Sequence, residues 1–166
     1  MNIELRKLKI VESMSEETTA FTADIYVDGY KSGYAKNDGQ GGCTFYHAYE
    51  ERRGLIEQAE AYCLGLPAKD YGSFKLPMNL EHFIDNIVDE TLQAKDKAKF
   101  DKKLQKDMLK GICVKTDLGY SLLTWKGFTV EQMLSNPKGR TVVYQKVRDL
   151  KAEGKQVLNT NVPSNL

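Results

Sequence analysis

The stretch FTADIYVDGYKSGYAK, residues 21–36, decides the fold of the N-terminal part of the chain. Apolar side chains occupy every second position from Phe21 to Val27, which is the pattern of a β-strand with one buried face. Asp28-Gly29 follows at once, and this dipeptide favours a two-residue hairpin because it tolerates positive φ angles. The sequence therefore predicts that residues 30–36 turn back and pair with the strand before them.

Further strands are expected on both sides of this hairpin. Residues 2–13 predict a first strand whose apolar pattern shifts near Arg6, and such a shift requires a bulge or a twist. Residues 43–48 predict a fourth strand, which follows a glycine-rich loop at residues 37–42. Together these segments predict a four-stranded antiparallel meander.

Helices should follow the meander. Residues 50–64 carry apolar side chains at helical spacing, so this helix is expected to cover one face of the sheet. Its expected buried face consists of Leu55, Ile56, Ala59, Tyr62 and Cys63. Asn79 can then cap a second helix with a strong apolar stripe, and a lysine-rich stretch continues it as far as Gly111.

The C-terminal part predicts a β-hairpin, residues 112–116 and 120–126, followed by a short helix that starts with a capping box of Thr129 and Gln132. A turn at residues 135–139, a last helix that stops at Gly154 and an extended tail at residues 156–166 complete the chain. The predicted class is α+β: a four-stranded antiparallel meander packed by a helix, then a long helix, a β-hairpin and C-terminal helices.

Charge is distributed unevenly along a chain of ordinary globular composition, with 41% hydrophobic and 28% charged residues. Residues 1–94 contain 9 Lys and Arg against 16 Asp and Glu, a net charge of −7, whereas residues 95–166 contain 15 against 7, a net charge of +8. We expect an acidic part, residues 1–94, and a basic part, residues 95–166, either as two domains or within one continuous domain. A basic part suits a polyanionic partner, and the two parts could also attract each other.

The sequence predicts a cytoplasmic protein that does not contact membranes. No apolar stretch approaches the roughly 20 residues of a membrane span, and the N-terminal segment lacks the apolar core of a signal peptide. The three cysteines are odd in number and widely spaced, which suits a reducing compartment. We predict no metal site and no cofactor.

The segments TVEQML, residues 129–134, and TVVY, residues 141–144, followed by Leu150 and Gly154, resemble the winged helix-turn-helix family over about a fifth of the chain. In that family the second helix enters the major groove of DNA, where polar side chains meet base edges and cations contact phosphates. The resemblance implies that the DNA-contacting residues are Arg140, Thr141, Tyr144, Gln145 and Arg148. The alternative is a pair of amphipathic helices that pack on a sheet.

Two lysines of the lysine-rich helix, Lys103 and Lys106, are further candidates for phosphate contacts. Three aspartates interrupt the lysines of this helix, so a solvated helix face is an equally good interpretation. The leading hypothesis is a non-enzymatic binding protein whose basic C-terminal part contacts nucleic acid, with DNA as the candidate partner.

A second hypothesis places function on the meander. Five of the nine tyrosines lie between Tyr26 and Tyr49, and exposed tyrosines on a sheet can stack on bases or anchor a protein partner. Packing within the sheet is the structural alternative. For a protein-binding accessory or inhibitor protein, the candidate residues in the meander and its glycine-rich loop are Tyr30, Tyr34, Asn37, Asp38, Gln40 and Tyr46.

Enzymatic functions have little support in the sequence. Asp28 with Glu57 or Glu60 is similar in order to the carboxylates of ribonuclease-H-like, metal-dependent nucleases, but a third acid on a later strand is missing. We therefore predict no catalytic residue.

Two further segments, AKNDGQGGCT at residues 35–44 and LNTN at residues 158–161, are similar to small uncharacterised proteins of bacterial mobile elements and phages. That resemblance implies no function.

Overall fold

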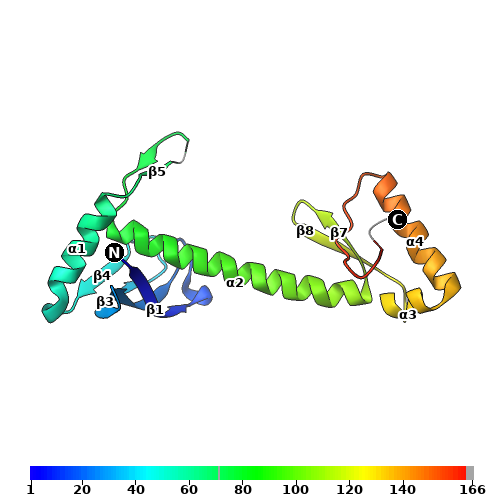
Figure 1. Cartoon of the computed structure of the whole chain (residues 1–166), viewed down its shortest axis with the longest axis horizontal. Coiled ribbons are helices and arrows are strands. Elements are labelled where there is room, and N and C mark those ends of the chain that lie inside the picture. The colour runs from blue at the N-terminus through cyan, green and yellow to red at the C-terminus, as the bar shows by residue number, and fades with distance from the viewer. Residues whose placement is uncertain (71, 164–166) are drawn as a thin grey trace. The chain divides into compact units, whose positions relative to one another are not determined.

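The structure, a computed structural model, describes residues 1–70 and 72–163, so the last three residues of the predicted tail lie outside the described part. It confirms the α+β class (Figure 1). The strands and α-helices are β1 (Ile3–Ile10), β2 (Phe21–Val27), β3 (Tyr30–Asn37), β4 (Phe45–Ala48), α1 (Arg53–Leu64), β5 (Lys69–Asp70), β6 (Lys75–Leu76), α2 (Leu80–Lys110), β7 (Gly111–Thr116), β8 (Gly119–Thr124), α3 (Val130–Ser135) and α4 (Pro137–Ala152).

The chain forms two compact units, Met1–Lys95 (unit 1) and Asp96–Leu166 (unit 2), and the boundary between them falls within α2. Each unit has its own hydrophobic core, and the two cores share no residue. Unit 1 contains 10 Lys and Arg against 16 Asp and Glu, a net charge of −6, and unit 2 contains 14 against 7, a net charge of +7.

Strands β1 to β4 form an antiparallel sheet in sequence order, as the sequence predicts. The β2–β3 turn has positive φ at both Asp28 (47°) and Gly29 (86°). The expected irregularity in β1 is also present, because the register shifts between Arg6 and Lys9, and Lys7 has a φ of 53°. A second irregularity, beside Tyr26 in the β2–β3 pairing, was not predicted.

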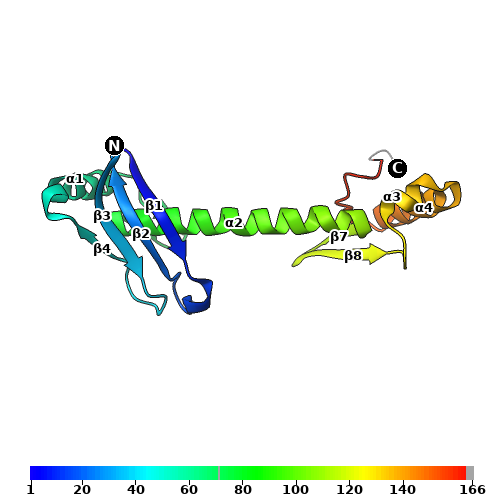
Figure 2. The ribbon, with the colours of Figure 1, turned by 90° about the horizontal axis from the view of Figure 1, so that it is seen from below.

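Helix α1 and the first part of α2 cover one face of this sheet, and Figure 2 looks onto the other face. The core contains Ile25 and Val27 from the sheet, packed with side chains from both helices. The helical core residues are Ile56, Ala59 and Cys63 of α1 and Leu80, Ile84 and Val88 of α2. Tyr62 is 40% exposed, so its predicted burial is wrong. At about 100° per residue it lies at the edge of the stripe that Ile56, Ala59 and Cys63 define.

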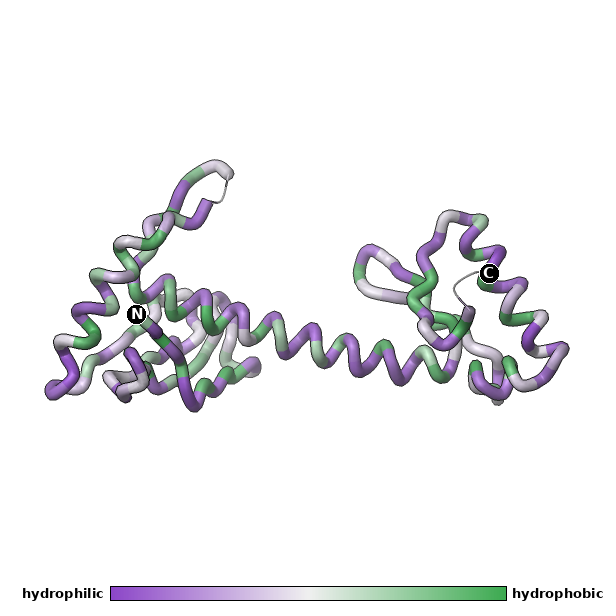
Figure 3. Tube along the Cα trace, viewed as in Figure 1, coloured by the Kyte–Doolittle hydropathy of each residue, from purple (hydrophilic) through white to green (hydrophobic). Residues whose placement is uncertain are grey.

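Helix α2 begins as predicted, because the Asn79 side-chain oxygen accepts a hydrogen bond of 2.7 Å from the His82 amide. Every residue from 93 to 103 is exposed, and Figure 3 shows this stretch as mainly hydrophilic. Within it, the Phe100 ring packs edge-on against the Tyr120 ring of β8, at a centroid distance of 5.5 Å. The rest of the stretch depends mainly on its backbone hydrogen bonds and on the helix propensity of its residues.

Unit 2 is built on the hairpin of β7 and β8. The chain after α4 pairs with the free edge of β7: Lys115 donates to the Gln156 carbonyl, and Leu158 donates to the Cys113 carbonyl, both at 2.9 Å. Strand β7 is therefore central, which explains why residues 111–114 are buried. The extended tail that the sequence predicts at residues 156–166 is, in its described part, joined to this sheet.

Helix α3 begins with the predicted capping box, in which Thr129 accepts from the Gln132 amide (3.2 Å) and donates its own amide to the Gln132 side chain (2.9 Å). The predicted turn at residues 135–139 is wrong. Helix α4 already begins at Pro137, and the Asn136 side chain caps it. Proline favours the first helical position because it has no amide hydrogen to satisfy and its φ is already helical.

The three cysteines are free thiols in different surroundings. Cys43 is exposed, whereas Cys63 in unit 1 and Cys113 in unit 2 are fully buried. Burial raises the pKa of both buried thiols above the ordinary value. In the part of the chain that the structure describes, no helix is long and apolar enough to span a membrane.

Candidate nucleic-acid interface

One side of α4 anchors the helix in unit 2. Val143, Val147 and Leu150 are at most 3% exposed and pack with Ile112 and Val130 in the core of this unit. The spacing of these three residues defines a single buried stripe. The orientation of α4 within unit 2 is therefore fixed, and with it the set of side chains that face outward.

The opposite side of α4 carries three of the five residues proposed for DNA contact. Thr141, Gln145 and Arg148 are exposed and follow one another at intervals of four and three residues, so they share one face. Gln145 donates a hydrogen bond of 2.8 Å to Asp149, one turn further along the helix. Lys138, which the sequence analysis missed, is exposed three residues before Thr141, in the first turn of α4.

The other two proposed contacts flank this face. Arg140 is exposed, and its Nε donates to the Leu134 carbonyl at 2.9 Å, which ties the start of α4 to the end of α3. Tyr144 is half-buried and packs against the core of unit 2. Of the five residues that the helix-turn-helix resemblance implies for DNA contact, Tyr144 therefore has a structural role.

Lys103 and Lys106 are exposed on α2, a different helix, and lie three residues apart. Acids compensate part of the positive charge of this helix. Lys110 donates to Asp107 at 2.8 Å, and the Asp107 pKa is lowered by hydrogen bonds from Lys110 and Tyr120. Lys99 pairs with Asp96 at 3.4 Å. Both the phosphate-contact interpretation and the solvated-face interpretation of these lysines remain consistent with this arrangement.

The residues of the second hypothesis do not form a single surface. Tyr34 is exposed on the side of the sheet away from the helices, and its ring centroid lies 5.6 Å from that of His47. Tyr46 faces the helices, where its hydroxyl donates to Glu60 at 2.8 Å. Burial and the Glu60 carboxylate raise the Tyr46 pKa to about 12. Tyr30 lies at the hairpin end of β3, where the Arg52 guanidinium is 5.0 Å from its ring.

Hydrogen bonds within the glycine-rich loop and to residues 16–18 hold the loop in place. Asn37 accepts from the Thr18 hydroxyl (2.9 Å) and the Gly39 amide (2.8 Å), so its side chain builds the loop. The Gly39 carbonyl accepts from the amides of Glu16 and Glu17. A Cβ on Gly39 would lie 2.1 Å from the Met14 carbonyl oxygen. Of the three candidate residues in this loop, Asp38 and Gln40 are exposed and Asn37 is half-buried.

An acidic cleft of about 490 Å³ lies between this loop and α2 within unit 1. The carboxylates that line it are Glu16, Glu17, Glu81, Asp85 and Asp89. Asp85 accepts from the Thr44 hydroxyl at 2.5 Å, and burial, opposed by this hydrogen bond, raises its pKa. Such a cleft repels the phosphates of a nucleic acid.

Asp28 and Glu60, which were considered for a nuclease site, accept hydrogen bonds from different partners. Asp28 accepts from the Asn2 amide at 2.7 Å, while Glu60 accepts from Tyr46. Among the described residues no three His, Cys, Asp or Glu side chains are placed to hold a metal ion. A two-metal site needs such a cluster, and Asp28, Glu57 and Glu60 do not form one.

The exposed face of α4 is thus the part of the chain where polar and cationic side chains project together from an anchored helix in a basic unit. Comparisons of the chain with protein-family models, with curated proteins and with solved structures find no match, so its function is inferred from this geometry.

Proposed function

We propose that the protein binds double-stranded DNA through the exposed face of α4. The observation that carries the proposal is the two-sided character of this helix. Val143, Val147 and Leu150 anchor it, and Thr141, Gln145 and Arg148 project from the opposite side. The major groove admits an α-helix, and side chains of these types can donate to or accept from base edges there.

The charge of unit 2 supports the same proposal. Its net charge of +7 attracts a polyanion, and Lys138 and Arg140 lie in the first turn of α4, beside the projecting face. Phosphate contacts position a protein on the duplex, and base contacts provide specificity. In this arrangement Lys138 and Arg140 contact phosphates, and Gln145 and Arg148 contact base edges.

Titration of the full chain into fluorescent duplex DNA, followed by anisotropy, tests the proposal. Arg148→Ala and Gln145→Ala should each weaken binding by about 5- to 150-fold, because loss of a base or phosphate contact costs about 1–3 kcal/mol. Arg53→Ala is the matched control, because it removes an exposed arginine from α1 in unit 1. Wild-type affinity should also fall steeply between about 50 and 200 mM salt.

The proposal fails if Arg53→Ala weakens binding as much as Arg148→Ala does. It also fails if the wild-type protein shows no duplex binding at about 50 mM salt, where electrostatic attraction is strong. Thermal unfolding of each variant identifies a loss of binding that results from misfolding.

A further inference from the structure

We propose that the sheet of unit 1 binds single-stranded nucleic acid on the face away from the helices. This face, called the open face below, carries the outward side chains of β1 to β4. Figure 2 looks onto this face of the sheet. The proposal goes beyond duplex binding by α4, because it uses residues of the other unit and another form of nucleic acid.

Three aromatic rings cluster on the open face. Tyr34 of β3 lies directly opposite His47 of β4, and Phe45 is two residues away on the same side of β4. The ring centroid of Tyr34 is 6.1 Å from that of Phe45, and the planes of Phe45 and His47 differ by 7°. Tyr34 is 37% exposed and Phe45 is 49% exposed. Exposed rings on a sheet are platforms on which unpaired bases stack.

The strand register extends this cluster into two rows across the sheet. One row pairs Arg6, Asp24, Tyr34 and His47 in turn, and the next pairs Lys9, Thr22, Lys36 and Phe45. Each row has an aromatic residue on β4 and a cation on β1. A shallow groove of about 350 Å³ covers the β1 to β3 part of these rows, and its charged and aromatic lining consists of Lys7, Lys9, Asp24, Tyr34 and Lys36. Bases and phosphates of one strand can therefore meet different ends of the same row.

The open face is basic although unit 1 is acidic. Five cations project from it or its bulge: Arg6, Lys7, Lys9, Lys31 and Lys36. Three carboxylates accompany them: Glu4, Asp24 and Asp38. The other acids of unit 1 lie in the β2–β3 turn, at residues 12–17, at residues 50–60, in the β5–β6 hairpin and on α2. The fold therefore separates the charges and leaves the open face with an excess of cations.

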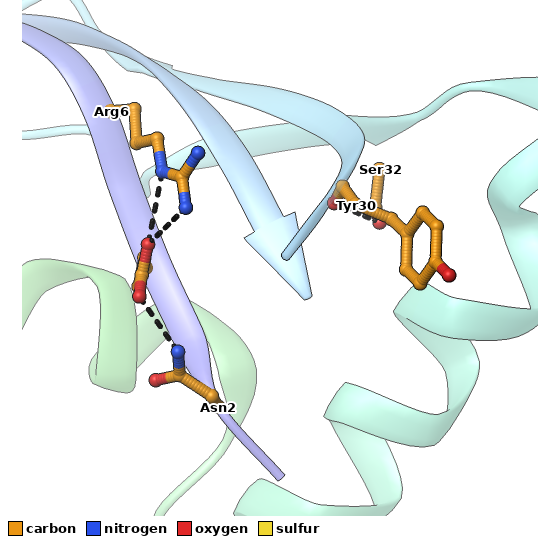
Figure 4. Close-up of polar contacts among 5 residues, drawn as sticks. Asn2, Arg6, Tyr30 and Ser32 are labelled. Carbon is orange, nitrogen blue, oxygen red and sulfur yellow. Dashed lines mark hydrogen bonds and ion pairs between the residues drawn. The ribbon is translucent and has the colours of Figure 1, made fainter. Parts of the chain in front are cut away.

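Local contacts hold these cations in place. Arg6 donates from Nε and Nη2 to one oxygen of Glu4, at 3.0 and 2.8 Å, and Asn2 donates to the other oxygen (Figure 4). The Arg6 guanidinium also lies 4.1 Å from the centre of the Tyr26 ring. Lys31 pairs with Asp24 at 3.0 Å. The charge of each of these two carboxylates is thus already balanced by a neighbouring cation.

A single nucleic-acid strand fits this surface better than a protein partner does. Protein interfaces are depleted in lysine, whereas four of the five cations here are lysines. A backbone of phosphates is neutralised by such residues, and its bases take the place of water on the aromatic rings. A duplex keeps its bases paired and stacked, so it cannot use the Tyr34–Phe45 cluster.

The test measures binding of the full chain to fluorescent oligo(dT) of about 20 nucleotides at about 50 mM salt. Tyr34→Ala and Phe45→Ala should each weaken binding by about 5- to 150-fold, the range expected for one lost stacking contact. Tyr34→Phe keeps the ring and should bind as the wild type does. Tyr62→Ala removes an exposed tyrosine from α1 and is the matched control.

Phe45→Trp gives a readout that does not depend on truncation. Its added indole emission should be quenched by oligo(dT), measured against the wild-type protein, whose single tryptophan, Trp125, belongs to unit 2. In the Arg148→Ala background, Tyr34→Ala should still weaken oligo(dT) binding relative to Tyr34→Phe, which separates this proposal from the proposal for α4. The inference is overturned if the wild-type chain does not bind oligo(dT), or if Tyr34→Ala binds as tightly as Tyr34→Phe. Binding of a protein to the same face in place of oligo(dT) would also overturn it.

Discussion

At the residue scale, Asp85 is a carboxylate whose charge the fold disfavours. Burial raises its pKa above the ordinary 3.8, and the neighbouring Glu81 and Asp89 act in the same direction. Between the ordinary and the raised pKa the folded state binds more protons than the unfolded state, so the free energy of unfolding increases as the pH falls through this range. The ionised Asp85 therefore costs stability at neutral pH.

Asp85→Asn should accordingly make unit 1 more stable at pH 7, because the amide oxygen can still accept from Thr44 and carries no charge. The difference from the wild type should shrink as the pH approaches 3.8. Urea unfolding followed by circular dichroism at several pH values measures it. Glu57→Gln, on the exposed side of α1, is the control. A variant less stable than the wild type at pH 7 would contradict the prediction.

Asn159 joins the C-terminal segment to the rest of unit 2. Its Oδ1 accepts from the buried Cys113 amide at 2.6 Å, and its Nδ2 donates to the Gly111 carbonyl at 2.9 Å. Asn159→Ala leaves the Cys113 amide without this acceptor, which should cost about 1–3 kcal/mol. Urea unfolding followed by the fluorescence of Trp125 measures the loss, with Ser121→Ala on β8 as the control. Equal stability of the two variants would show that water replaces the lost contacts.

At the element scale, the exposed stretch of α2 is stabilised by its helix propensity. Ala98→Gly should cost about 1 kcal/mol of local helix stability and accelerate amide exchange in residues 93–103 about fivefold. Lys97→Ala, which preserves propensity, should not accelerate it. Unchanged exchange in Ala98→Gly would mean that packing, and not propensity, holds this stretch.

Elements with a complete local signal could be predicted from the sequence. The alternation from Phe21 to Val27, the Asp28-Gly29 turn and the Thr129 capping box each contain their own signal within a few residues. The start of α4 was missed, although Asn136-Pro137 is itself a cap followed by a favoured first residue.

Contacts between distant segments left no local signal. Nothing around residue 157 indicates that this segment pairs with β7, because the pairing depends on an edge that only the folded hairpin supplies. The placement of the tyrosines on two sides of the sheet could be predicted in part from the sequence. Tyr34 and His47 face outward and Tyr46 faces inward because alternate residues of a strand point to opposite faces.

At the scale of the whole molecule, two cores without a common residue imply two separate responses to mutation. Val147→Ala creates a cavity in unit 2 and should lower its free energy of unfolding by about 1–3 kcal/mol. Amide exchange in β2 and β3 should remain as in the wild type. Ile84→Val, in the core of unit 1, should give the converse pattern. Parallel changes in both units would show that the chain unfolds as one cooperative body.

Because the three thiols differ in burial, their alkylation can report local unfolding of each unit. A thiol reacts as its thiolate, so an alkylating reagent reaches a cysteine only when the cysteine is accessible and able to ionise. One label per chain is expected under native conditions, at Cys43. A label at Cys63 then reports an opening of the sheet–helix core of unit 1, and a label at Cys113 reports an opening of the central strand of unit 2. Mass spectrometry of the protein after different alkylation times thus measures the opening rates of both cores separately, without any substitution in the chain.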